Sequence, residues 1–136
     1  MDVLMPSTIG LCVARAKSVL AEFTEETWKV QPKLPGTKTQ RMVTVRDDSG
    51  PDDSVQTRRR KGVNVWAPSS VEAENTALLL MAGFRSMPDG SPVTATDQFT
   101  GPFEVIDDAT DLLSVGGVTL SHYYFAFRLT ARGTDF

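Results

Sequence analysis

The sequence predicts an α+β fold in which two main helices pack on one face of a mixed, largely antiparallel sheet of four to five strands. Two segments, at about 7–23 and 69–87, carry apolar residues at helical spacing, and each needs another layer to cover its stripe. Several other segments alternate apolar and polar residues, as half-buried strands do. A sheet with both helices on one face buries both stripes together.

The composition indicates one globular domain, which we expect to span residues 1–136. The chain is 40% hydrophobic and 23% charged, values that are ordinary for a folded domain. Its longest apolar run, at 77–82, is too short to cross a membrane, and its first residues lack a secretory signal pattern. Cys12 is the only cysteine, which excludes an internal disulfide and a Cys-based zinc site and favours folding in a reducing cytoplasm.

The first helix is predicted from Ser7 to about Phe23, with Ser7 in position to cap free amides. Its stripe consists of Ile9, Cys12, Val13, Ala16, Leu20 and Phe23. After the helix, Trp28 and Val30 predict a short strand. The prolines and the glycine in segment 31–36 predict a turn or an extended arm.

Two strands follow, separated by a polar segment. Alternation predicts a half-buried strand at 42–46 and a second strand at 57–67. The segment between them, at about 47–57, is predicted to be a flexible loop. On the second strand, Val63 and Val65 share a face with Arg59 and Lys61, so this strand is expected to leave the core at its charged end.

The second helix is predicted to begin with a capping box formed by Ser69 and Glu72 and to run to about Met87. Its apolar surface is wide, which predicts that the helix is covered on most sides.

Beyond the second helix, short strands are expected at 93–99 and 103–106, on either side of a Gly–Pro pair. The segment at 107–117 is predicted to be a loop that ends in a Gly116–Gly117 turn. A final long strand is predicted at 118–130.

Residue types that carry chemistry are sparse, and no catalytic, cofactor or metal site is predicted. His122 lies between strand residues, and Cys12 lies on the apolar stripe of the first helix, where cysteine behaves as a small core residue. The aspartates of segment 107–111 lack the ligand spacing of a calcium loop. Gly116 and Gly117 have no following lysine and precede a strand, unlike a phosphate loop.

Charge is segregated along the middle of the chain, although the net charge is only −3. An acidic group precedes a basic group, and the candidate residues are Asp47, Asp48, Asp52, Asp53, Arg58, Arg59, Arg60 and Lys61. Three interpretations stay open for the basic group: a solvated strand end, a contact with an acidic patch of a neighbouring subunit, and a direct DNA contact. The overall acidity and the lack of interleaved aromatic residues disfavour the DNA contact.

The order of these features resembles the tail terminator proteins of long-tailed (siphovirus-type) bacteriophages. The resemblance rests on the strand Val63-Asn64-Val65-Trp66-Ala67 followed by the capped helix 69–84, and on the Gly101–Pro102 connection. It also includes the Asp107–Asp108 loop and the terminal strand Tyr123-Tyr124-Phe125-Ala126-Phe127-Arg128-Leu129. It spans nearly the whole chain, except for segments 31–36 and 47–53.

The resemblance implies a non-enzymatic structural protein of the virion, located at the head-proximal end of the tail and assembled in the host cytoplasm. Such proteins form a six-membered ring that caps the tail tube, stops its polymerisation and presents a surface to the head-side connector, or stopper. DNA passes through the lumen without specific binding. We therefore hypothesise that the basic group 58–61 faces acidic residues of group 47–53 across a subunit boundary.

Two alternatives remain open at this stage. One is another head–tail joining protein of the neck, such as a stopper or an adaptor. The other is a small metal-dependent enzyme that uses His122 and the aspartates near Asp107.

Overall fold

The computed structural model confirms the predicted α+β fold and describes residues 3–48, 50, 56–87, 92–106 and 112–135. Within these residues the elements are β1 (Val3–Leu4), α1 (Thr8–Phe23), β2 (Lys29–Gln31), β3 (Met42–Asp48), β4 (Gln56–Ala67), α2 (Ser70–Arg85), β5 (Val93–Glu104), β6 (Ser114–Val115), β7 (Val118–Thr119), β8 (Ser121–Arg132) and β9 (Thr134–Asp135). None of these helices is both long enough and apolar enough to span a membrane.

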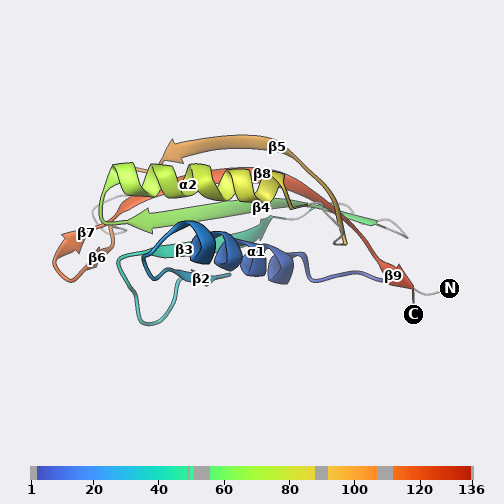
Figure 1. The fold of residues 1–136 in the computed structure, drawn as a ribbon, viewed down its shortest axis with the longest axis horizontal. Coiled ribbons are helices and arrows are strands. Elements are labelled where there is room, and N and C mark those ends of the chain that lie inside the picture. Colours follow the sequence, from blue (N-terminus) through green and yellow to red (C-terminus); the bar gives the residue numbers. More distant parts are fainter. Residues whose placement is uncertain (1–2, 49, 51–55, 88–91, 107–111, 136) are drawn as a thin grey trace.

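The main sheet has the described strand order β2-β3-β4-β8-β5. β2 runs parallel to β3, and the other neighbours are antiparallel, so the sheet is mixed as predicted. Both helices lie over the same face of this sheet (Figure 1). β1 and β9 pair in a separate ribbon near the two termini, and β6 and β7 form a hairpin toward the opposite end of the long axis.

The main core lies between the sheet and the helices. Val63, Val65, Phe125 and Phe127 project from the central strands and are fully buried, and Phe84 of α2 stacks on Phe127 with 4.8 Å between the ring centroids. Alternation along the strands puts these residues on one face, as the sequence predicted. The described face on the far side of the sheet carries no helix.

The helix starts follow their predicted caps. The Ser7 hydroxyl accepts from the Gly10 amide, and the Ser69 hydroxyl accepts from the Glu72 amide. The second half of the predicted capping box is wrong, because the Glu72 carboxylate binds Arg41 instead of reaching back to the cap.

Two strand predictions need correction. β3 extends to Asp48, so Asp47 and Asp48 belong to a strand rather than to the predicted flexible loop, while Ser49 and residues 51–55 lie outside the described residues. From Met42 to Val45 β3 is buried on both faces, not half-buried. On its helix-free side, Met42 packs with Trp66 and Leu120 near the β6–β7 hairpin.

The region after α2 also differs in detail. The two strands expected around Gly101–Pro102 form one strand, β5, with register shifts against β8. The predicted strand at 118–130 divides into β7 and β8, and the turn predicted at Gly116–Gly117 is confirmed as the tip of the β6–β7 hairpin.

Candidate interaction surfaces

The lone histidine and the lone cysteine lie on different faces of the main sheet. His122 stacks on Trp66 with 4.3 Å between the ring centroids, and its Nε2 lies 2.7 Å from Asn64 Oδ1. Cys12 lies on the helix side in the main core, where burial raises its pKa to about 12. The sheet separates the two side chains, so they do not form a nucleophile–base pair.

A metal site is not visible in the part of the chain that the structure describes, since no group of three or more His, Cys, Asp or Glu residues meets there. The aspartates at 107–111 lie outside the described residues.

The burial of Lys61 differs most from what the sequence predicted. Its side chain is fully buried, although the strand was expected to leave the core here. Lys61 Nζ lies 3.1 Å from Asp47 Oδ1 and donates to the Thr8 hydroxyl at 2.6 Å. β3 and β4 pair Asp47 directly with Lys61, so the two side chains share the face that α1 covers. Lys61 and Asp47 are therefore partners within one chain, and Lys61 has no exposed surface to present to a neighbour.

Arg59 also projects toward the helix side. Together with Thr57 and Asp47 it lines a pocket of about 300 Å³ beside the start of α1. Its Nε donates to the Thr57 hydroxyl at 3.1 Å.

Arg58 and Arg60 project to the opposite, helix-free face, and both are exposed. The strand register pairs Arg60 with Asp48 on one side and with Arg128 on the other. Arg128 in turn binds Asp97 of β5 through two hydrogen bonds of 2.8 Å, which lower the pKa of Asp97. A row of charged side chains therefore crosses four strands in the order Asp48, Arg60, Arg128, Asp97, with the two arginines between the two aspartates.

A second row, next to the first, joins Arg46 to Tyr124. The Arg46 guanidinium lies 5.7 Å from the Tyr124 ring centroid and donates to Asp48 at 2.7 Å. Tyr124 lies across Gly62, where a Cβ would come within 2.9 Å of the tyrosine Oη. We call the helix-free surface formed by Arg46, Arg58, Arg60, Arg128 and Tyr124 the arginine face. These residues come from three strands, so the amino-acid sequence alone does not reveal them as one basic surface.

The helix layer carries a different surface. Phe23 is 62% exposed, Val71 is 67% exposed and Leu78 is 47% exposed. Phe23 and Leu79 both line two adjoining hollows between α1 and α2, of about 390 and 270 Å³. The prediction that Phe23 joins the buried stripe is therefore wrong, and Val19 is buried in its place. The prediction that α2 is covered on most sides is also wrong within one chain.

Charged side chains lie beside these apolar side chains. Glu22 and Arg15 line one hollow, Glu72 lines the other, and Glu25 is exposed nearby in sequence. We call the surface formed by Phe23, Val71, Leu78, Leu79, Glu22, Glu25 and Glu72 the helix-end patch.

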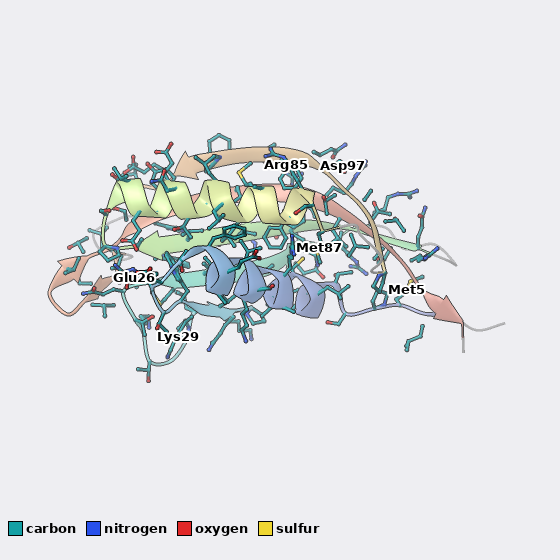
Figure 2. All side chains as sticks on the ribbon, viewed as in Figure 1. Met5, Glu26, Lys29, Arg85, Met87 and Asp97 are labelled. Atoms are coloured by element: carbon teal, nitrogen blue, oxygen red, sulfur yellow. The ribbon has the colours of Figure 1, made fainter. Side chains whose placement is uncertain are left out.

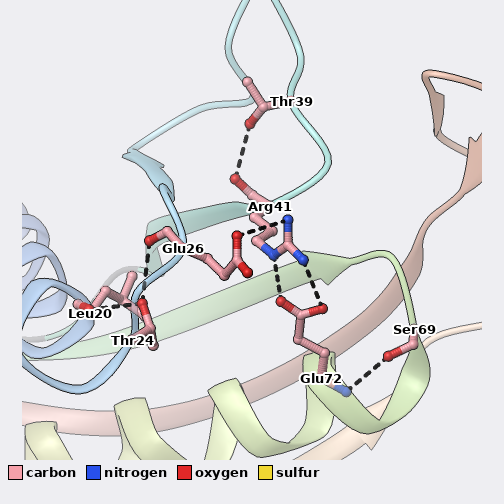
Figure 3. A network of polar contacts seen from close by, with 7 residues as sticks. All are labelled: Leu20, Thr24, Glu26, Thr39, Arg41, Ser69 and Glu72. Carbon is pink, nitrogen blue, oxygen red and sulfur yellow. Dashed lines mark hydrogen bonds and ion pairs between the residues drawn. The ribbon is translucent and has the colours of Figure 1, made fainter.

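Arg41 fixes the geometry at this end of the helix layer (Figure 3). Its guanidinium binds Glu72 through two hydrogen bonds and pairs with Glu26 at 3.5 Å. These bonds raise the pKa of Arg41. They join the start of α2 to the segment that follows α1, where the Thr24 hydroxyl donates to the Leu20 carbonyl.

Comparison with protein-family models and with curated proteins finds no match to this chain.

The eight charged residues that the sequence singled out do not form one surface. Asp47, Lys61 and Arg59 lie on the helix side, and Asp48, Arg58 and Arg60 lie on the helix-free side, while Asp52 and Asp53 lie outside the described residues. The helix-end patch was not predicted from the sequence. Its only sign there was that the apolar surface of α2 is wider than packing against the sheet alone would bury.

Proposed function

We propose that this chain is a structural tail terminator, which assembles as a six-membered ring on the end of a bacteriophage tail tube. In this proposal the ring stops tube polymerisation and presents a surface to the head-side connector. The observation that carries the proposal is the presence of two chemically unlike exposed surfaces, the arginine face and the helix-end patch, on opposite layers of the fold.

Unlike surfaces support a ring for a geometric reason. A closed ring with one kind of subunit uses heterologous contacts, in which one patch of a subunit meets a different patch of the next. Exposed apolar side chains as large as Phe23 mark interaction sites when they cluster with other apolar residues. The net charge of −3 also suits a ring through which DNA slides without being held.

Tail length in particles assembled without this chain tests the proposal. Negative-stain electron microscopy is expected to show overlong tubes detached from heads, because nothing ends polymerisation. Complementation with the intact chain is the control, and it is expected to restore tails of one length.

Two other outcomes contradict the proposal. Tails of normal length that fail to join heads would assign the chain to the neck, as a stopper or an adaptor. Intact particles would remove it from head–tail assembly altogether.

A further inference from the structure

The end of the arginine face that carries Arg58 and Arg60 lies far along the molecule from the helix-end patch. α1 ends and α2 begins at the helix-end patch, close to where β4 ends at Ala67. Arg58 lies eight residues before Trp66 on the same strand, which corresponds to about 26 Å of extended chain. In Figure 2, Glu26 beside the patch and Asp97 beside the arginine face are well separated along the long axis.

The two surfaces also lie on different layers. The helix-end patch belongs to the helix layer, and the arginine face lies on the other side of the sheet. Because both the sheet and its length separate them, one copy cannot bring its own two surfaces together. Contact between them requires two copies, and each copy would still have one surface of each kind available for the next.

The chemistry of the two surfaces is complementary. Glu22 and Glu25 are exposed on the patch, and Arg46, Arg58 and Arg60 are exposed on the face. Tyr124 provides an aromatic surface among the arginines, and Phe23 and Val71 provide apolar surface among the glutamates. Such a pairing covers the apolar side chains while charge complementarity sets the register.

We propose that the helix-end patch of one copy docks on the arginine face of a second copy, and that this is the subunit boundary of the ring. The inference rests on the proposed function and adds the two surfaces that meet. It also replaces the hypothesis that group 58–61 faces group 47–53, because Asp47 and Lys61 bind each other within the chain.

The arginine face fits a protein surface better than a nucleic acid. Asp48 and Asp97 lie at the two ends of the row that contains Arg60 and Arg128. A phosphate backbone laid along this row would meet two carboxylates, whereas a partner surface with mixed charges can match both signs.

Cross-linking between two single-cysteine variants tests the contact. Glu25→Cys places a thiol on the patch, and Arg60→Cys places one on the face. Cys12 is fully buried and its pKa is raised to about 12, so it does not compete. With a short bis-maleimide, a cross-linked dimer is expected in the mixture of the two variants and not with either variant alone. Glu25→Cys mixed with Lys38→Cys, an exposed site away from the face, is the matched control.

A charge swap tests the chemistry of the same contact. With the face thiol kept at Arg60→Cys, Arg46→Glu/Arg58→Glu should lower the cross-linked yield on the order of tenfold or more, because like charges then face each other. Adding Glu22→Lys/Glu25→Lys on the partner, with the thiol moved to Val71→Cys, should restore it. Lys33→Glu/Lys38→Glu changes the net charge by the same amount as the arginine variant and should leave the yield unchanged.

Three results would overturn the inference. The first is the absence of a mixed cross-link at the highest soluble concentration, and the second is a cross-link that forms with one variant alone, as an isologous dimer would give. The third is an arginine variant that keeps the cross-link but loses salt-dependent binding to duplex DNA, which would assign the face to a polyanion. Tail length remains a separate measurement. If particles assembled without the chain have overlong tails but the variants do not cross-link, the proposed function stands and the contact is refuted. If the variants cross-link but particles assembled without the chain are normal, the contact stands and the proposed function is refuted.

Discussion

Lys61 Nζ lies 3.1 Å from Asp47 Oδ1 while the whole lysine side chain is buried and the aspartate side chain is 33% exposed. The pair is therefore asymmetric, because only one of its members can reach water. Breaking a buried ion pair leaves an uncompensated charge, but replacing the buried member with an apolar side chain of similar size is often neutral.

Asp47→Ala is expected to lower the free energy of unfolding by about 3 kcal/mol, since the Lys61 ammonium stays buried with the Thr8 hydroxyl as its remaining partner. Lys61→Met is expected to change it by less than about 1 kcal/mol, because methionine fills the space and the Asp47 carboxylate can be hydrated. Urea unfolding of both variants measures the difference. Equal losses in the two variants would contradict this asymmetry.

Gly83 of α2 packs against Val19 of α1. A Cβ at Gly83 would lie 2.6 Å from Val19 Cγ2, so Gly83→Ala must displace the Val19 side chain or push the helices apart. We expect a net loss of about 1–3 kcal/mol, even though alanine is the better helix former. The double variant Gly83→Ala/Val19→Ala should lose less than the sum of the two single variants. Additive losses in a thermal or urea double-mutant cycle would show that the two positions do not couple.

Cys12 makes the stability of the protein depend on alkaline pH. Burial raises its pKa from 9.0 to about 12, so the folded state keeps the proton more tightly than the unfolded state. This contribution is complete below pH 9.0 and is lost as the pH rises toward about 12. The stability advantage of the wild type over Cys12→Ala should therefore shrink in urea unfolding as the pH rises above 9.0 toward about 12. An advantage that does not change with pH would rule out this linkage.

Asp97 also makes the stability of the protein depend on pH, but in the acid range and in the opposite direction. Its hydrogen bonds to Arg128 lower its pKa below 3.8, so its contribution is complete above 3.8 and is lost as the pH falls through the lowered value. Both side chains are partly exposed, so solvent screening keeps the effect small. Asp97→Asn should be less stable than the wild type at about pH 6, and the gap should narrow as the pH falls below 3.8. Asp48→Asn provides a comparison on the same face, and a gap that persists at the lower pH would refute the assignment to Asp97.

The strength of the local signals explains how much of the fold could be predicted. Both helices and their capping serines follow from short sequence patterns, and so do the faces of β4 and β8, because alternation along one strand decides which side chains share a face. The charged candidates were also recognised from a local pattern, because they cluster in one short stretch of the sequence. Their partners could not be recognised, because no local pattern shows which distant residues they meet.

By itself, the sequence determined where the two helices and the central strands lie and which side chains on each of them point the same way. The tertiary structure alone decided what lies opposite each side chain. Pairing of β3 with β4 placed Asp47 beside Lys61, and pairing of β4 with β8 and β5 gathered Arg60, Arg128 and Asp97 into one row. Packing of α1 against α2 left Phe23 exposed and buried Val19. The physical reason is that burial and charge pairing depend on contacts between distant segments, which strand register and helix packing establish only when the chain folds.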